Sequence, residues 1–160
     1  MARVEGIGPV LLSAVREWLG TGCQIRVLPV LDPAGIAAVD AYEVPDRMAE
    51  AVLTRSPASV FPWSAITNRH RFDLDHTIPY TGPPGGPPGQ TRPDNLGPLS
   101  RGEHRFKTYG RISVRQPDAG TFVWRTRFGR VIVTNPAGTH DLGTGASADA
   151  VWHSATHCTP

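Results

Sequence analysis

The sequence predicts a small α+β protein built from short helices and small antiparallel β hairpins. Stretches with apolar side chains at helical spacing alternate with shorter stretches rich in β-branched residues, which end at Gly, Pro or Asp turns. In addition, 17 glycines and 16 prolines among 160 residues indicate abundant loops without the composition of a disordered chain. A chain of this length can bury a modest core as one domain, with or without a small appendage.

The first 55 residues are predicted to form a helix, a hairpin and a second helix. Pro9–Leu19 has apolar residues at helical spacing, so this helix is expected to face a core. Gln24–Leu31 and Gly35–Val44 are expected to pair as two strands. Pro45–Arg55 starts with proline, which suits the first position of a helix, and continues at helical spacing. Residues 1–55 are therefore predicted to form a segment of their own, which can be the remnant of a larger domain.

Basic charge is concentrated in the middle of the chain. Residues 69–130 contain eleven Lys and Arg against five Asp and Glu, whereas residues 1–68 and 131–160 each carry a small negative balance. A positive segment of this kind supplies the phosphate attraction that nucleic-acid binding requires. The alternative is a solvated, Arg-rich surface without a partner.

Side chains suited to cutting phosphodiesters gather in the same segment. Asp75-His76 ends a short predicted strand, and Asn95 and His104 follow a long Pro/Gly-rich loop. A carboxylate oxygen suits Mg²⁺ or Mn²⁺, and an imidazole with a pKa near neutrality can take a proton from water. Each residue alone is weak evidence, because an Asp-His pair is more often a turn and a lone histidine is more often a surface residue. Their combination indicates metal-dependent hydrolysis.

The sequence also predicts the structure of the loop and the helix around these residues. Tyr80–Asp94 has no periodicity, and its prolines remove amide donors, so it is interpreted as an extended connection between two strands rather than a phosphate-binding loop. Ser100 is predicted to cap a helix over Arg101–Tyr109, and Ser100 with Glu103 has the spacing of a capping box. Gly110 is expected to end this helix in the left-handed conformation.

The residue order resembles that of the HNH endonucleases, whose shared core is a ββα-metal (His-Me) finger. The pattern is similar to the C-terminal HNH domain of a bacterial family in which a long helical N-terminal domain of unknown function precedes the finger. Tyr42-Glu43-Val44-Pro45 and Arg55 stand at matching places in this chain. The resemblance is strong from Arg55 to Thr108 and loose over the rest of residues 1–140.

One departure from the family concerns its cysteine knuckle. The first half of the knuckle corresponds to Ser59–Ser64 in this chain, and the second half, before the histidine, corresponds to Ser100–Glu103. All four thiol positions are therefore replaced, by Ser59, Ser64, Ser100 and Glu103. A structural zinc needs about four ligands, so we expect no structural zinc. The capping box is expected to fix the helix start instead.

The resemblance implies a role for each candidate residue. Asp75 and His104 would hold one divalent cation, with Mg²⁺ or Mn²⁺ expected first and Ni²⁺ or Zn²⁺ as alternatives. His76 would be the general base that activates water, and Asn95 would keep that base oriented. The implied activity is hydrolysis of DNA phosphodiester bonds by a metal-dependent HNH endonuclease.

Three basic residues on the predicted helix, Arg101, Arg105 and Lys107, are candidates for contacts with the nucleic acid. Contacts with phosphate carry no sequence information. The expected partner is therefore DNA with weak sequence preference.

The region after the helix is expected to continue in β structure. Arg111–Gln116, Thr121–Arg127 and Arg130–Asn135 alternate in strand fashion and are separated by turn residues. Residues 56–135 would thus form the HNH domain with its trailing β hairpin. Residues 136–160, rich in Gly, Ala, Ser and Thr, are expected to be a disordered tail.

Cysteine usage and hydropathy suggest the compartment. Cys23 and Cys158 have no C-x-x-C partner, so neither a disulfide framework nor a thiolate zinc site is indicated. No export signal and no apolar run of membrane-spanning length is evident. A cytoplasmic protein without a membrane partner is expected.

Two other classes of function remain open at this stage. The chain can be a catalytically inactive DNA-binding module on the HNH scaffold, because the cysteine knuckle and the long helical region of the family are missing. It can also be a protein-interaction or structural domain that uses the finger as a scaffold. Metal-dependent cleavage and salt-sensitive DNA binding would separate the three.

Overall fold

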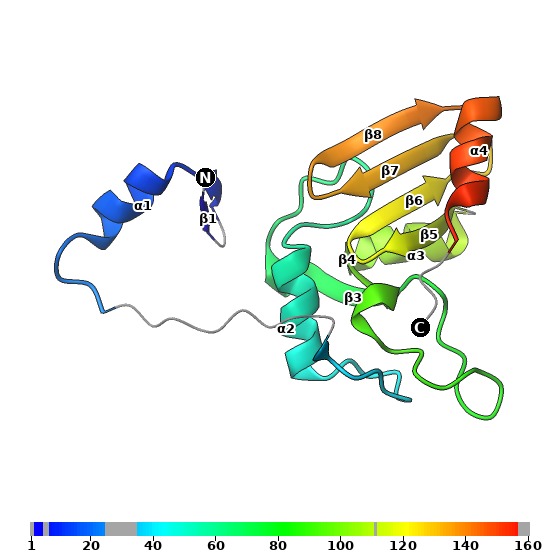
Figure 1. The fold of residues 1–160 in the computed structure, drawn as a ribbon, viewed down its shortest axis with the longest axis horizontal. Coiled ribbons are helices and arrows are strands. Elements are labelled where there is room, and N and C mark those ends of the chain that lie inside the picture. The colour runs from blue at the N-terminus through cyan, green and yellow to red at the C-terminus, as the bar shows by residue number, and fades with distance from the viewer. Residues whose placement is uncertain (1, 5–6, 25–34, 111, 157–160) are drawn as a thin grey trace.

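The computed structural model describes residues 2–4, 7–24, 35–110 and 112–156 of the chain. In these residues the protein has the predicted α+β class, with its strands arranged in small antiparallel sheets (Figure 1). The elements in chain order are β1 (Ala2–Val4), β2 (Gly8–Val10), α1 (Leu12–Leu19), α2 (Asp46–Arg55), β3 (Phe72–His76), β4 (Leu96–Ser100), α3 (Arg101–Tyr109), β5 (Ser113–Asp118), β6 (Thr121–Arg125), β7 (Val131–Asn135), β8 (Gly138–Gly143) and α4 (Ala146–Ser154).

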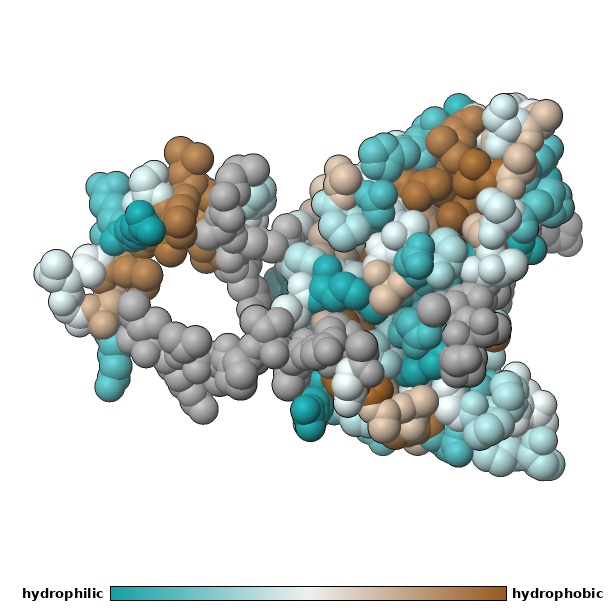
Figure 2. Space-filling view, in the orientation of Figure 1, coloured by the Kyte–Doolittle hydropathy of each residue, from teal (hydrophilic) through white to brown (hydrophobic). Residues whose placement is uncertain are grey.

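The N-terminal helix is formed as predicted, but it does not face a core. α1 follows the two-stranded β1–β2 hairpin, and none of its residues is buried. Leu11, Leu12 and Trp18 are exposed, and Figure 2 shows apolar side chains gathered over this part of the molecule. The prediction that its apolar face is buried is therefore wrong for the described chain.

The predicted hairpin between the first two helices lies partly outside the described residues. Most of its first strand, Gln24–Leu31, lies outside the described residues. Its second strand, Gly35–Val44, is an irregular segment in which a single residue, Val39, pairs antiparallel with Thr91. The part of this segment that the structure describes is thus tied to the later loop through Val39 and Thr91.

Helix α2 begins and ends almost as predicted, and it belongs to the body of the protein. Met48 and Val52 are buried together with Leu96 of β4, and Val39 and Leu74 pack against this cluster. The guanidinium of Arg55 donates to the carbonyl of Pro93 at 2.6 Å and to that of Leu96 at 2.8 Å. α2 and the segment before it therefore share a core with residues that follow them in the chain.

β3 and β4 form an antiparallel hairpin, and α3 starts at the residue after β4. The register pairs Phe72 with Ser100 and His76 with Leu96. The predicted capping box is present, since the Ser100 hydroxyl accepts from the Glu103 amide and the Glu103 carboxylate accepts from the Ser100 amide. These hydrogen bonds satisfy backbone donors that a helix start leaves unpaired.

The end of α3 differs from the prediction. Gly110 has φ −81° and ψ 0°, which is right-handed and not the left-handed conformation expected of a terminal glycine. A Cβ at this position would overlap the carbonyl of Phe106. Glycine is therefore needed for close backbone approach rather than for a positive φ.

The C-terminal half is a four-stranded antiparallel sheet in the order β5-β6-β7-β8. The strands predicted after the helix are confirmed with shifts of a few residues at their ends. One face of the sheet, with Phe122, Trp124 and Ile132, packs against Leu99 of β4 and against Val60. The β3–β4 hairpin therefore rests on the sheet and shares its core.

The expected disorder of residues 136–160 is wrong for residues 138–156. β8 completes the sheet, and α4 covers its other face (Figure 1), where Ala148 and Trp152 are buried against Val123 and Val131. The guanidinium of Arg115 lies 4.2 Å from the centre of the Trp152 ring. Burial of one large aromatic side chain outweighs the weak helix-forming composition of this segment. Residues 157–160 lie outside the described chain.

The described helices are all too short or too polar to cross a bilayer.

Candidate active site

Asp75 and His104 meet at the place where β3 ends and α3 begins. Oδ1 of Asp75 lies 3.0 Å from Nε2 of His104. Asp75 stands next to the end of β3, and His104 lies in the first turn of α3, so the capping box at Ser100 determines where this imidazole stands. The Asp75 side chain is 12% exposed and that of His104 is 41% exposed. The pair is therefore partly desolvated and open to solvent on one side.

The separation of these two atoms can be compared with the geometry of a bound cation. Neighbouring ligands around an octahedral cation with bonds of about 2.1 Å lie ~3.0 Å apart. One carboxylate oxygen and one imidazole nitrogen also form a donor set that several divalent cations accept. Among the described residues, no group of three His, Cys, Asp or Glu side chains comes together. Asp75 and His104 would thus be the two protein ligands of any cation at this place, with the other positions left to water or substrate, and the same 3.0 Å separation also suits a direct hydrogen bond between them.

Lys107 lies on the inner side of the same carboxylate. Its ammonium contacts Oδ2 of Asp75 and donates to the carbonyl of His76 at 2.7 Å. The lysine side chain is only 13% exposed. Lys107 is therefore engaged inside the chain, whereas the sequence suggested a cation free to contact a phosphate backbone. Asp75 divides its two oxygens between Lys107 and His104.

His76 is 5% exposed and is enclosed by aromatic rings. The Tyr42 ring stacks on the imidazole with centroids 5.7 Å apart, and the Tyr80 ring lies at the same distance. Burial lowers the pKa of His76 and Lys107 lowers it further, while the charge of Asp75 acts in the opposite direction. His76 is therefore neutral at neutral pH, as a group that accepts a proton must be.

Asn95 connects the segments on either side of the long loop. Its Oδ1 accepts from the amide of Ile78 at 2.8 Å, and its Nδ2 donates to the carbonyls of Ile78 and Gln90 at 3.2 Å and 2.9 Å. Its backbone carbonyl accepts from the amide of Thr77 at 2.8 Å. Asn95 thus fixes the backbone directly after His76, in keeping with an orienting role.

Thr91, Tyr42 and Tyr80 also surround His76, and sequence reasoning missed all three. The Thr91 hydroxyl lies 2.8 Å from Nε2 of His76. Thr91 lies inside the long loop and Tyr42 lies 34 residues before His76, whereas Tyr80 follows His76 by only four residues and carries no motif of its own. The Tyr42-Glu43-Val44-Pro45 pattern was the one feature that could have drawn attention to Tyr42.

Arg101 and Arg105 lie on the outer surface of α3. Both are exposed, and the Arg101 side chain approaches Asp73 at 3.7 Å in a pair that is open to solvent. Such exposed pairs contribute little to stability, so the Arg101 guanidinium can exchange Asp73 for another anion at small cost.

Two hollows flank the Asp75–His104 pair. One, of about 620 Å³, runs past His76 and Lys107, and the other, of about 770 Å³, runs past Arg101 and Arg105. Asp75, His104 and Tyr42 line both hollows. The candidate ligands therefore lie between two adjoining depressions, an arrangement that suits an elongated substrate.

The four positions that correspond to the family's thiols form a hydrogen-bonded cluster at the start of α3. The Ser59 hydroxyl donates to Oε2 of Glu103 at 2.7 Å, and Ser64 and Ser100 also bond to this residue. Burial by itself would raise the pKa of Glu103, but the bonds from Ser64, Ser100 and Ser59 outweigh it and lower the pKa. These bonds favour the ionised carboxylate. The sequence predicted the capping bonds between Ser100 and Glu103, but not the bonds from Ser59 and Ser64.

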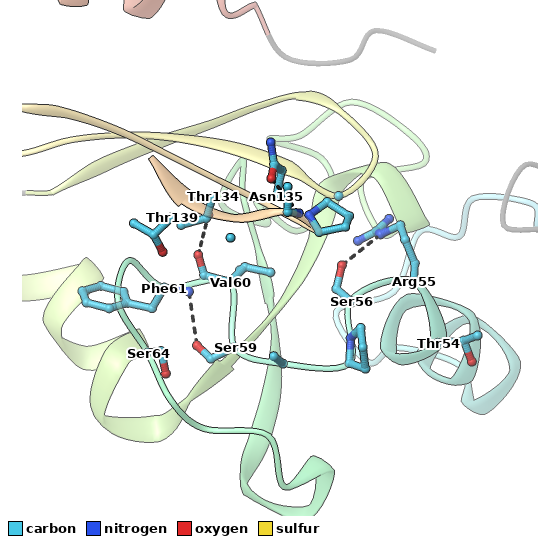
Figure 3. A pocket seen from close by; sticks show the side chains of 16 residues that line it. Thr54, Arg55, Ser56, Ser59, Val60, Phe61, Ser64, Thr134, Asn135 and Thr139 are labelled. Atoms are coloured by element: carbon cyan, nitrogen blue, oxygen red, sulfur yellow. Dashed lines mark hydrogen bonds between the residues drawn. The ribbon is translucent and has the colours of Figure 1, made fainter. Parts of the chain in front are cut away.

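A further hollow, of about 400 Å³, lies beside this cluster between residues 54–64 and the turn from β7 to β8 (Figure 3). Within it the Thr134 hydroxyl donates to the carbonyl of Val60 at 2.7 Å, and Arg55 donates to the Ser56 hydroxyl at 3.2 Å. These bonds join the loop after α2 to the sheet.

Comparison with known proteins gives one relative and no family. No family model matches the chain, and no solved structure matches it. An uncharacterized protein of Mycobacterium tuberculosis, Rv3776, is 31% identical over 161 residues, which cover 99% of this chain and 28% of the relative. The chain thus corresponds to somewhat more than a quarter of the length of a longer protein to which it is similar.

Proposed function

We propose that the chain is a metal-dependent HNH endonuclease in which β3, β4 and α3 form a ββα-metal finger. The observation that carries the proposal is the convergence of Asp75 and His104 at 3.0 Å beside the buried His76. These three side chains come from the end of a strand and the first turn of a helix, as the resemblance implies. The two adjoining hollows leave room for a polymer.

In this proposal His76 accepts a proton from the water that attacks the phosphorus atom. The bond from phosphorus to the 3′ oxygen breaks, so the products carry 5′-phosphate and 3′-hydroxyl ends. Asn95 keeps His76 in place through the backbone of Thr77 and Ile78. Asp75 and His104 would hold a divalent cation, which when bound supplies charge stabilisation for the phosphate and the leaving oxygen.

Positioning of the nucleic acid falls to the exposed arginines of α3. Arg101 and Arg105 line the outer hollow and point the basic charge of the segment toward solvent. Contacts of guanidinium groups with phosphate position a duplex without reading its sequence. DNA with weak sequence preference is the proposed substrate.

The test is plasmid cleavage with Mg²⁺, Mn²⁺ or Ni²⁺. His76→Ala is expected to reduce the rate roughly 10²–10⁴-fold, the usual contribution of a general base. His153→Ala, which removes an exposed imidazole from α4, is the matched control and should cleave at the normal rate. Equal cleavage by His76→Ala and the parent protein would refute the assignment.

One observation favours a second candidate, a DNA-binding module without catalysis. Lys107 places a positive charge against the same carboxylate that would hold the cation. If this charge prevents cation binding, the protein would still bind DNA in a salt-sensitive manner but would not cut it. No added metal would then produce cleavage, and calorimetry would detect no Mn²⁺ binding.

A further inference from the structure

Thr91 is fully buried, with 0% of its surface exposed, between His76 and the irregular segment before α2. Its backbone pairs with Val39 in both directions, at 2.9 Å and 3.3 Å. Its hydroxyl makes two contacts, one with Nε2 of His76 at 2.8 Å and one with the carbonyl of Ala41. The position of this hydroxyl is therefore set by the backbone of another segment and does not depend on His76.

The number of protons available decides the direction of these two hydrogen bonds. A threonine hydroxyl has one proton to donate and lone pairs that accept, whereas a carbonyl oxygen can only accept. The contact with Ala41 therefore requires the hydroxyl proton of Thr91. Toward His76 the same oxygen can act only as an acceptor, so Nε2 must carry a hydrogen.

This direction determines the tautomer of the imidazole. A neutral histidine has one ring nitrogen that carries hydrogen and one that has a free lone pair. With the hydrogen on Nε2, the lone pair is on Nδ1. Among the described residues no group forms a hydrogen bond with Nδ1, and His76 lines the hollow that contains Asp75 and His104.

We propose that Thr91 is a positioning residue that holds His76 as the Nε2–H tautomer and so makes Nδ1 the atom that accepts the proton from water. The role of Nδ1 in proton transfer rests on the proposed nuclease function, whereas the tautomer of His76 does not depend on it. The opposite tautomer would need the Thr91 hydroxyl to donate to Nε2 and to leave the carbonyl of Ala41.

The side chain of Thr91 allows a matched pair of variants. Thr91→Val keeps the shape of the side chain and removes the hydroxyl, so it can neither accept from His76 nor donate to Ala41. Thr91→Ser keeps the hydroxyl and removes a methyl group. A purely structural role would make both variants similar in their effect on His76, whereas a positioning role separates them.

The experiment is nitrogen NMR of the histidine rings in the full chain without added metal, at a pH where His76 is neutral. The His76 signals are identified by their loss in His76→Gln. The parent protein and Thr91→Ser are expected to show the Nε2–H tautomer, and Thr91→Val is expected to show a mixture or the Nδ1–H form. In cleavage assays Thr91→Val should lower kcat at least about tenfold with little change in KM, and Thr91→Ser should restore most of the rate.

Two results would overturn the proposal. One is the Nδ1–H tautomer in the parent protein, which decides the matter even if Thr91→Val fails to fold. The other is an unchanged tautomer in a folded Thr91→Val protein. Because the NMR measurement needs neither metal nor cleavage, absence of nuclease activity with the Nε2–H tautomer would count against the proposed function alone. Cleavage together with the Nδ1–H tautomer would count against this inference alone.

Discussion

Oδ1 of Asp75 and Nε2 of His104 lie 3.0 Å apart, although the whole Pro/Gly-rich loop separates them in sequence. The contact depends on two independent local structures. The register of β3 with β4 places Asp75 opposite Gly97, and the capping box at Ser100 fixes the first turn of α3.

Removal of the Asp75 carboxylate or the His104 imidazole is expected to abolish chelation of the cation. Asp75→Asn and His104→Ala should each weaken Mn²⁺ binding at least about tenfold in calorimetry without DNA. The double variant should be little weaker than either single one, because donors that act as a unit give non-additive losses. His153→Ala is the control. Independent, additive losses would mean that the two residues do not share one cation.

Lys107 is expected to limit the affinity for the cation, because its charge lies on the same carboxylate. Lys107→Met should raise Mn²⁺ affinity by at least roughly tenfold, since like charges a few ångströms apart repel by between about 1 kcal/mol in water and about 4 kcal/mol at a protein surface, and ~1.4 kcal/mol is tenfold in affinity. Lys107→Arg keeps the charge and should not raise it. A weaker Mn²⁺ affinity in Lys107→Met would show that the lysine supports Asp75 in a cation-binding geometry.

Tyr42 is 69% exposed, yet one face of its ring covers His76. Tyr42→Ala should let water reach the imidazole, and the pKa of His76 should rise toward about 6.5, because burial is the main cause of its lowered value. Titration of the ring protons by NMR in metal-free protein measures this shift. Tyr109→Ala removes an exposed ring at the end of α3 and should leave the pKa of His76 unchanged.

The same shift has a consequence for stability. A histidine whose pKa is lowered by folding binds fewer protons in the folded than in the unfolded state. The free energy of unfolding therefore falls as the pH drops below about 6.5 toward the folded pKa. This loss should be smaller in Tyr42→Ala than in the parent protein. Equal slopes of stability against pH in the two proteins would contradict the assignment.

Glu103 contributes in the same direction, with stability lost as the pH falls, but at a lower pH. Because folding lowers its pKa, its ionised form stabilises the protein above the unfolded pKa of about 4.3, and this contribution is lost as the pH falls through the folded value. Urea unfolding should show Glu103→Gln less stable than the parent at pH 7, with the difference shrinking below pH about 4. Glu17→Gln, on α1, is the control. A difference that does not change with pH would argue against an ionised Glu103.

The cluster around Glu103 also provides a test of the resemblance to the family with the cysteine knuckle. Cysteines introduced together at Ser59, Ser64, Ser100 and Glu103 should bind Zn²⁺, or Co²⁺ with the absorption of tetrahedral thiolate coordination. A variant with cysteine at Ser59 and Ser64 alone should bind either ion more weakly. Absence of uptake by the folded fourfold variant would mean that the four positions do not converge as thiol ligands.

The parts of this structure that the sequence predicted are those in which the information is local. Ser100 and Glu103 are three residues apart, so one helix start can be recognised from spacing alone, and the structure contains the capping box. The strands after α3 are likewise predicted from the local alternation of side chains between turn residues. Asp75, Asn95 and His104 were selected by residue type and order, and the structure brings Asp75 and His104 into contact.

The parts that could not be predicted depend on packing between distant segments. Thr91 has no distinctive neighbours, and nothing in the pattern around Tyr42 shows that its ring reaches His76. Both lie at His76 where Val39 pairs with Thr91. α4 has a composition that does not favour a helix strongly, and burial of Trp152 against the sheet compensates for this. The sequence alone indicates that Lys107 is exposed, because its position in the chain does not reveal its contact with Asp75.

Gly97 lies directly against the ring of Phe122, and a Cβ there would approach two ring carbons at 2.8 Å. Its partner across the hairpin is Asp75. A single added methyl group would thus push the hairpin away from the sheet at the position opposite the carboxylate. The placement of Asp75 therefore depends on an apolar contact made by its partner strand, outside the cluster of polar side chains.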